Sequence, residues 1–349
     1  MMKRRNGRTI KGALARACAL AIALAPAAAE AQEQVKLKFA DWLPTTHDTS
    51  AQGATVFAQK AEELGAGAIK IDYFPAEQLG KAADALRLAQ TGVADIVNIA
   101  PAYITEKFPL SGVAELPNIY QDACDGSLAF MKLSEAGGIL AEQEYKPNGM
   151  RMLFVAGLGS YRVLTATRPV ESASGFNGLK LRTAGGAMDM AAAALGATSV
   201  RMPGPDVLAS LSRGTLDGVF WPLQSVRPWG LQDTLSYLTP DLGVGSFTII
   251  FAISEERLQK LPQAVQTALV EAGRYATEHH CRYTEDRERS IVASLESENG
   301  IKPIALPEAD RTALTQRMNE VQDAWAKALD ARGLAGGTTL AAFRDALAD

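Results

Sequence analysis

The sequence predicts an α/β protein with two domains of the same type and one long helix late in the chain. Strand and helix patterns alternate between residues 35 and 101, the alternation recurs after residue 150, and a proline-free segment of helical periodicity follows residue 262. Such β-α-β alternation is typical of open sheets with crossover helices. The 349 residues are enough for two ordinary domains.

The first domain is indicated by three strand patterns separated by two helical ones. In VKLKFADWLP, Val35, Leu37 and Phe39 alternate with lysines, which is the period of a half-buried strand. A helix is predicted from about Ala51 to Leu64 and another in GKAADALRLAQTG. AIKIDYFP and VADIVNIAPA supply the second and third strands.

The second domain repeats this arrangement. MRMLFVAGLGSYRVLTAT is one long or broken strand, LKLRTAGGAMDMAAAALGATSVRMP is strand, helix and strand, and PDVLASLSRGTLDGVFWP is helix then strand. The very apolar GSFTIIFAIS is typical of a strand inside or bridging a sheet. With a junction near Gly157–Tyr161, the predicted boundaries are 32–159 plus about 247–288 for domain I, and 160–246 plus about 289–349 for domain II.

The long helix is predicted from Pro262 to about Glu298, where apolar residues recur at helical spacing. A helix of about 36 residues is on the order of 54 Å long, which exceeds one domain of this size. The simplest interpretation is a helix that runs along both domains. Its polar middle, TEHHCRYTEDRERS, predicts a kink or a solvent-spanning section.

The N-terminus has the pattern of a signal peptide over residues 1–31. A basic block precedes the short apolar run ACALAIALAPAAA, and AEA at Ala29–Ala31 fits a cleavage site that leaves Gln32 first. We expect an exported, soluble protein, by either the Sec or the twin-arginine route. Export makes a disulfide between Cys124 and Cys281 possible, but the sequence fits two separate thiols equally well.

Composition and motifs exclude several classes of function. The formal net charge of −4 argues against nucleic-acid binding. Neither a hydrolase, a metalloprotease nor a phosphate-loop motif occurs, and GLGSYR lacks the third glycine of a dinucleotide site. Three histidines, of which His279 and His280 are adjacent, do not suggest a metal site. We therefore predict no catalytic residue, no metal and no cofactor.

Arginine placement is the strongest sign of a binding site. Arg182 ends the strand LKLR, and the next helix starts a few residues later, with only Asp189 nearby to neutralise the charge. Ligands of open α/β sheets lie outside the carboxyl ends of strands, and helix N-termini favour anions. Arg162 lies on the preceding strand, and a guanidinium matches a carboxylate in bidentate geometry.

At this point the chain resembles the solute-binding proteins of TRAP transporters, the tripartite ATP-independent periplasmic family. The motif residues are GLKLR at Gly178–Arg182, LGA at Leu195–Ala197 and VLASLSRGTLDG from Val207. FPAEQLG, TGVADI, the signal peptide and the long helix match the family as well, so the resemblance covers essentially the whole mature chain. It implies a periplasmic binding protein whose ligand cleft lies between two domains and closes by hinge motion.

The resemblance also implies roles for individual residues. The arginine of GLKhR pairs with the ligand carboxylate, a role that falls on Arg182. Sialic-acid-binding members have a second arginine twenty residues upstream, a place that Arg162 takes. Where the family often has DGQENP this sequence has DGVFWP, which puts Trp221 near the ligand. Trp42 replaces a small polar residue of the first strand, and Gly204 replaces a bulky one.

These departures predict a less polar pocket, for an acid with an apolar or aromatic body rather than a sugar acid. Tyr103, Asn98 and His47 are secondary candidates for ligand contact. The resemblance implies the small and large TRAP membrane subunits as partners. The alternatives are a ligand-sensing protein that signals to a receptor, an exported enzyme on the same fold, and an ABC-type binding protein.

Overall fold

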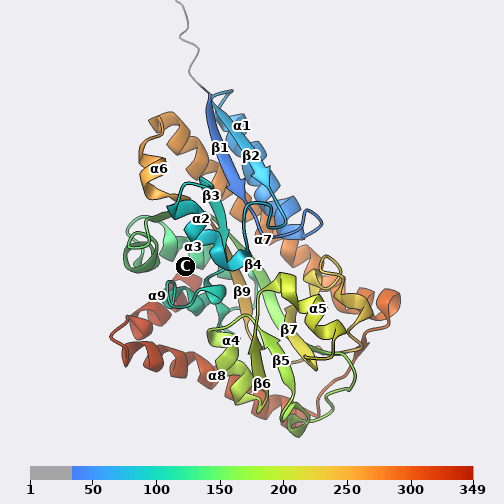
Figure 1. Ribbon diagram of the computed structural model, residues 1–349. Coiled ribbons are helices and arrows are strands. Elements are labelled where there is room, and N and C mark those ends of the chain that lie inside the picture. The colour runs from blue at the N-terminus through green and yellow to red at the C-terminus, as the bar shows by residue number, and fades with distance from the viewer. Residues whose placement is uncertain (1–33, 349) are drawn as a thin grey trace, which may run out of the picture. The chain divides into compact units, whose positions relative to one another are not determined.

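The computed structural model describes residues 34–348, so the predicted signal segment 1–31 lies outside the described part of the chain. Ten strands occur in that part (Figure 1). They are β1 (Val35–Ala40), β2 (Ile69–Phe74), β3 (Ile96–Ile99), β4 (Met150–Thr165), β5 (Lys180–Thr183), β6 (Thr198–Arg201), β7 (Gly218–Pro222), β8 (Tyr237–Thr239), β9 (Ser246–Ser254) and β10 (Lys302–Pro303).

The helices flank these strands and supply the connections between them. They are α1 (Thr55–Leu64), α2 (Ala85–Gln90), α3 (Ala123–Ser134), α4 (Ala187–Ala194), α5 (Val207–Ser212), α6 (Glu255–Gln259), α7 (Gln263–Asn299), α8 (Glu308–Asp330) and α9 (Gly336–Ala348). Short helical turns that matter below are η3 (Pro101–Tyr103), η4 (Leu110–Glu115) and η8 (Leu223–Ser225). The predicted mixed α/β architecture is confirmed.

The strand order β2-β1-β3-β9-β4-β7-β5-β6 divides into two parallel halves. β2, β1 and β3 run parallel in the first half, and β7, β5 and β6 run parallel in the second. Each half has the crossover helices that the sequence predicts, because parallel neighbours need a long connection. β1 shows why the pattern works, since the alternating Leu37 and Phe39 are buried while Lys36 and Lys38 are exposed.

Two long antiparallel strands join the halves. β9 pairs with β3 on one side and with β4 on the other, and β4 continues to pair with β7. Eight of the nine β9 residues are buried, as expected for a strand covered on both faces. The β4–β9 register shifts between Gly157 and Ser160, next to the predicted junction. The bridging strand and the long strand are therefore both confirmed.

The late helix is a single element, α7, of 37 residues. It packs against α1 and α3 of the first half and against η8 and β10 of the second, so it extends along both (Figure 1). Its polar middle is one-sided, because His280, Cys281 and Thr284 are buried there. This explains how a segment with so many charges remains helical against the protein core.

The C-terminal helices pack on elements of both halves. α8 contacts α4, whereas α9 contacts α3 and η4. In the described residues, no helix combines the length and the hydropathy that a membrane crossing requires.

A disulfide joins Cys124 at the start of α3 to Cys281 in α7, with the two Cα atoms 4.7 Å apart. The sequence left open whether these cysteines pair. The bond closes a loop over a separation of 157 residues. A cross-link of this span removes much conformational freedom from the unfolded chain, so it stabilises the fold.

Replacing both cysteines, Cys124→Ser with Cys281→Ser, should lower the free energy of unfolding by about 2–5 kcal/mol. Urea unfolding under oxidising conditions measures the difference. The unaltered protein treated with a reductant is the control, and its unfolding midpoint should move to that of the double variant. Equal midpoints for the variant and the oxidised protein would contradict a stabilising disulfide.

Candidate functional site

Arg182 lies in β5 and is among the largest fully buried side chains, with 1% of its surface exposed. Its Nε donates to the Met202 carbonyl at 3.0 Å and its Nη1 to the Phe220 carbonyl at 3.5 Å. Nη2 donates to the Tyr103 hydroxyl at 3.3 Å, and the guanidinium carbon lies 4.7 Å from the Trp221 ring centroid. All of these partners are electrically neutral.

The carboxylate nearest to Arg182 in sequence is engaged elsewhere. Asp189 accepts hydrogen bonds from Arg201 Nη2 at 2.6 Å and from the Thr183 hydroxyl at 2.5 Å. Among the residues that the structure describes, none forms an ion pair with Arg182. A buried charge without an opposite charge is costly, so this site is suited to an anion supplied from outside the chain.

Six aromatic side chains surround this guanidinium, and they come from both halves of the sheet. Trp42 stacks on Trp229 with ring centroids 6.2 Å apart, and the Trp221 ring meets Trp229 edge-on at 6.4 Å. The others are Tyr103, Tyr161 and Phe247. A Cβ atom at Gly204 would lie 3.4 Å from Trp229 and 3.6 Å from Trp221, which are ordinary van der Waals distances, so both indoles pack next to this glycine.

Polar groups in this wall have unused hydrogen-bonding capacity. The indole N–H groups of Trp42 and Trp221 are buried without an acceptor. A buried donor without a partner costs free energy, and an oxygen atom of a ligand would remove that cost. The space between the side chains is only about 10 Å³. The site is therefore contracted, and an organic ligand needs the walls to separate.

His47 also lies in the wall, and it connects the two halves. Its Nδ1 accepts the Thr49 N–H at 3.1 Å, so in the neutral ring Nε2 carries the proton and donates to the Ser225 hydroxyl at 2.9 Å. Burial, with a smaller effect from His280, lowers the His47 pKa to about 3. His47 is thus neutral near pH 7 and adds no charge to the site.

Asn98 does not line the cavity around Arg182. It is buried at the end of β3, where its Nδ2 donates to Asp41 Oδ1 at 2.6 Å. Asp41 also accepts the Leu43 N–H at 2.9 Å and the Tyr73 hydroxyl at 2.7 Å. Asn98 therefore helps to hold the segment that carries Trp42, one residue after Asp41.

Arg162 differs most from its expected place. Its Nε donates to the Pro240 carbonyl at 2.8 Å, and its Nη1 contacts the Ser160 hydroxyl and the Tyr161 carbonyl. It lines a separate, polar cavity that also contains Glu288 and Asp241. The expectation that Arg162 supports Arg182 does not agree with this geometry, because the neighbouring residue, Tyr161, faces the Arg182 cavity instead.

Sequence reasoning missed seven residues of the wall: Leu43, Leu158, Tyr161, Pro222, Ser225, Trp229 and Phe247. Tyr161 is adjacent to the arginine that was selected on spacing. Trp229 is one of only four tryptophans in the chain and was the one signal available. Ser225 and Phe247 carry no signal in the sequence, because only the fold brings η8 and β9 to this cavity.

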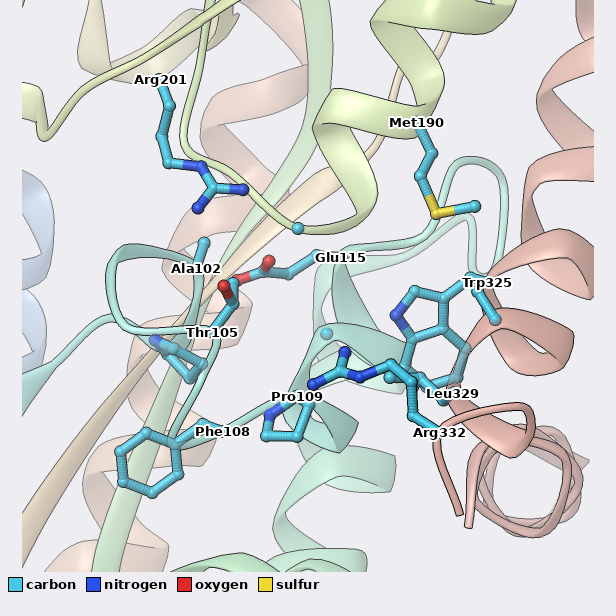
Figure 2. Close-up of a pocket in the computed structure, with 14 residues that line it drawn as sticks. Ala102, Thr105, Phe108, Pro109, Glu115, Met190, Arg201, Trp325, Leu329 and Arg332 are labelled. Atoms are coloured by element: carbon cyan, nitrogen blue, oxygen red, sulfur yellow. The ribbon is translucent and has the colours of Figure 1, made fainter. Parts of the chain in front are cut away.

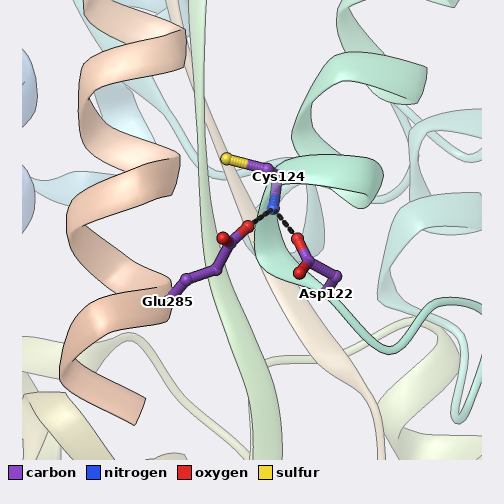
Figure 3. A group of neighbouring side chains, drawn as sticks. All are labelled: Asp122, Cys124 and Glu285. Atoms are coloured by element: carbon purple, nitrogen blue, oxygen red, sulfur yellow. Dashed lines mark hydrogen bonds between the residues drawn. The ribbon is translucent and has the colours of Figure 1, made fainter. Parts of the chain in front are cut away.

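One group of candidate metal ligands forms within residues 34–348: Asp122, Cys124 and Glu285 (Figure 3). The Cys124 sulfur is in the disulfide and offers no thiolate. Both carboxylates accept the Cys124 backbone N–H, each at 2.9 Å. Burial raises the Glu285 pKa to about 7. The arrangement is that of a helix N-cap at α3.

Glu115 is a second buried group that affects the charge near Arg182. The side chain is fully buried, and neither carboxyl oxygen has a partner in good hydrogen-bond geometry, although the backbone N–H of Thr248 is close enough to affect the carboxyl. Burial raises its pKa from 4.5 to about 8, while the Thr248 amide and the Arg182 charge act in the opposite direction. Glu115 is therefore protonated near pH 7 and does not neutralise Arg182.

The raised pKa of Glu115 predicts a pH-dependent stability. Between pH 4.5 and about 8 the unfolded chain releases this proton and the folded chain keeps it, so stability falls as pH rises across this window. Glu115→Gln should remove that fall. The gain in Tm over the unaltered protein should therefore grow from pH 5 to pH 8 and then level off.

Thermal unfolding followed by circular dichroism at pH 5, 6, 7 and 8 measures the difference. Glu271→Gln, at an exposed position of α7, is the matched control and should shift Tm equally at each pH. A constant offset between Glu115→Gln and the unaltered protein would show that Glu115 titrates normally.

The chain is similar to a family of bacterial extracellular binding proteins over most of its length. Residues 39–328 match the family model DctP, described as bacterial extracellular solute-binding protein, family 7. The C4-dicarboxylate-binding periplasmic protein DctP of Rhodobacter capsulatus is 26% identical over 98% of this chain and 99% of its own. A solute-binding protein of Roseobacter denitrificans is 29% identical over 65% of this chain and 68% of its own.

Solved structures agree with the fold. A TRAP periplasmic solute-binding protein from Bordetella bronchiseptica, with bound (R)- and (S)-mandelate, is 27% identical, with a TM-score of 0.80 over 90% of this chain and 98% of that one. A marine metagenome TRAP solute-binding protein in complex with 3-hydroxybenzoate has a TM-score of 0.82 over 90% of this chain and 98% of that one, at 22% identity. Since the family model spans most of the chain, this protein belongs to family 7 of the bacterial extracellular solute-binding proteins, the TRAP solute-binding proteins.

Proposed function

We propose that this chain captures a small organic acid as its carboxylate at Arg182 and delivers it to the membrane subunits of a TRAP transporter. The observation that carries the proposal is the buried guanidinium whose partners are all neutral. A ligand carboxylate would supply the missing negative charge in bidentate geometry. It would bind without being chemically transformed, as befits relatives that are solute-binding proteins.

The walls favour a ligand with an aromatic or apolar body. Three of the four tryptophans, with Tyr103, Tyr161 and Phe247, surround the anchor. The polar groups near them, the two indole N–H groups and the His47–Ser225 pair, suffice for one or two ligand oxygens beyond the carboxylate. A sugar acid would leave most of its hydroxyls without partners. The mandelate-bound relative, at 27% identity, supports this ligand class.

Capture requires a change of conformation, because the cavity of about 10 Å³ is too small for any organic acid. We place the moving boundary where β4 and β9 connect the halves, with domain I as 32–159 plus about 247–288 and domain II as 160–246 plus about 289–349. Trp42–Trp229 stacking and the Tyr103–Arg182 hydrogen bond join the two halves and would break on opening. The chain would act in the periplasm after cleavage of its signal segment near Ala31.

A thermal-shift screen should identify the ligand class. Benzoate and mandelate should raise Tm more than succinate, and sialic acid should have no effect. A ligand present at 100 times its Kd stabilises the folded protein by about 2.7 kcal/mol. Stabilisation by sialic acid or by amines alone would show that the proposed ligand class is wrong.

Arg182→Ala should weaken the tightest acid found in that screen by about 2–5 kcal/mol, more than about thirtyfold in Kd, because it removes one side of a buried charge pair. Arg182→Lys should weaken it as well, since an ammonium lacks the planar fork. Isothermal titration calorimetry measures the Kd of each variant. Where a titration shows two binding steps, the Kd of the tighter one is compared.

The matched control is Arg162→Ala, the same substitution on β4 at a residue that lines another cavity. Its Kd should stay within about threefold of the original. Circular dichroism should verify that each variant is folded. An unchanged Kd in Arg182→Ala, with the fold intact, would rule out the proposed anchor.

A further inference from the structure

A second cavity, of about 210 Å³, lies beside the contracted site and shares no lining residue with it. Its walls come from the segment after β3, from the start of α4 and from α8 (Figure 2). Phe108, Pro109, Met190, Trp325 and Leu329 make them mostly apolar. A cavity of about 150 Å³ is enough for benzene, so this one accepts a single ring with a small substituent.

A buried carboxyl lies in the wall of this cavity. Figure 2 shows the Glu115 side chain among the residues that line the cavity, with its carboxyl group beside Ala102 and Thr105 and on the side of Arg201. Glu115 is fully buried, and both of its carboxyl oxygens lack hydrogen bonds. Buried polar groups in proteins are nearly always hydrogen-bonded, so an unpartnered carboxyl at a cavity indicates a missing ligand. Since its pKa is about 8, this carboxyl can donate a hydrogen bond near pH 7.

The charges around the cavity determine the sign of the ligand. Arg201 is paired with Asp189 through Nε and Nη2, which leaves its Nη1 outside that pair. Arg332 also lines the cavity, and no ion pair to it occurs among residues 34–348. Arg332 and Arg201 are both exposed, so water hydrates their positive charges, and together they favour an anion over a cation at this wall. A ligand carboxylate would be attracted to both, whereas an amine would meet two arginines.

We propose that this cavity is a second binding site, for a small aromatic monocarboxylate whose ring lies against Trp325 and whose carboxylate is bound between Arg332, Arg201 and the Glu115 carboxyl. The site is separate from the Arg182 anchor, so the chain has a capacity of two acid molecules. A ligand in the second site would contact segments of both halves, because η3 and α4 both contribute residues to the wall.

The test is calorimetric titration with benzoate, up to millimolar concentration, of the protein and of two variants. Arg182→Ala removes the proposed anchor of the first site. Ala328→Trp fills the second cavity, since Ala328 lines it from α8. The matched control is Ala313→Trp, at another exposed position of α8 that does not line the cavity.

In Arg182→Ala and in Ala313→Trp, benzoate should still occupy the second site, with one saturable equivalent. In Ala328→Trp the Kd of the second site should rise about tenfold or more, while any binding that depends on Arg182 is retained. Benzylamine, with the opposite charge on the same ring, should not bind Arg182→Ala. A rise in pH above 8 should weaken the second site, because an ionised Glu115 repels a carboxylate.

Two results would overturn the second site: no benzoate binding to a folded Arg182→Ala protein, or a second equivalent that Ala328→Trp leaves unchanged. Binding of benzylamine in place of benzoate would overturn the ligand class. A different result would contradict the Arg182 proposal: Arg182→Ala would bind benzoate as tightly as the unaltered protein, and Ala328→Trp would not bind it at all. That result would support the second cavity as the site of capture.

Discussion

A positive charge buried between neutral groups is the constraint on which the rest of the structure depends. Arg182 keeps its guanidinium in the interior by donating to two backbone carbonyls and a phenol and by facing an indole ring. These contacts use three of its five N–H donors without cancelling its charge. The other titratable groups near it are neutral, because burial lowers the pKa of His47 and raises that of Glu115. The site therefore keeps a net positive charge near pH 7.

That charge is held by contacts between the two halves of the sheet. Tyr103, from the first half, accepts hydrogen bonds from both Arg182 and the Gly204 N–H of the second half. Trp42 stacks on Trp229 across the same boundary, and His47 bonds Ser225. These contacts close the cavity almost completely. Groups that surround a ligand in a closed protein contact one another here instead, which is consistent with a site that must open to be filled.

The two cavities are lined by similar side chains but differ in volume. Each combines an arginine with tryptophan, but one is contracted to about 10 Å³ and the other is about 210 Å³ in volume. Packing accounts for the difference. The first is lined by large rings that fit against each other and pack next to Gly204. The second is bordered by α8, which contributes Trp325 and Leu329 to a wall that leaves the space open.

Local pattern in the sequence determined the elements and predicted Arg182 as the anchor. Alternation identified β1, helical spacing identified α7, and the position of Arg182 at a strand end predicted its place at the carboxyl edge of a parallel sheet. Trp42 and Trp221 were predicted differently, from the positions at which the sequence departs from the motifs of the family that it resembles. Each of these features depends on residues within a few positions of one another.

Long-range geometry was decided by the tertiary structure alone. Ser225 and Phe247 reach the cavity only because β9 crosses between the halves and α7 packs against η8. Tyr161 and Arg162 are consecutive in β4 and so face opposite sides of the sheet. The β4–β9 register shifts between Gly157 and Ser160, just before them, and spacing in a sequence does not reveal such an irregularity. The pairing of Cys124 with Cys281 likewise needed two helices to meet with Cα atoms 4.7 Å apart. A distance across 157 residues is a property of the packed chain, and no local pattern encodes it.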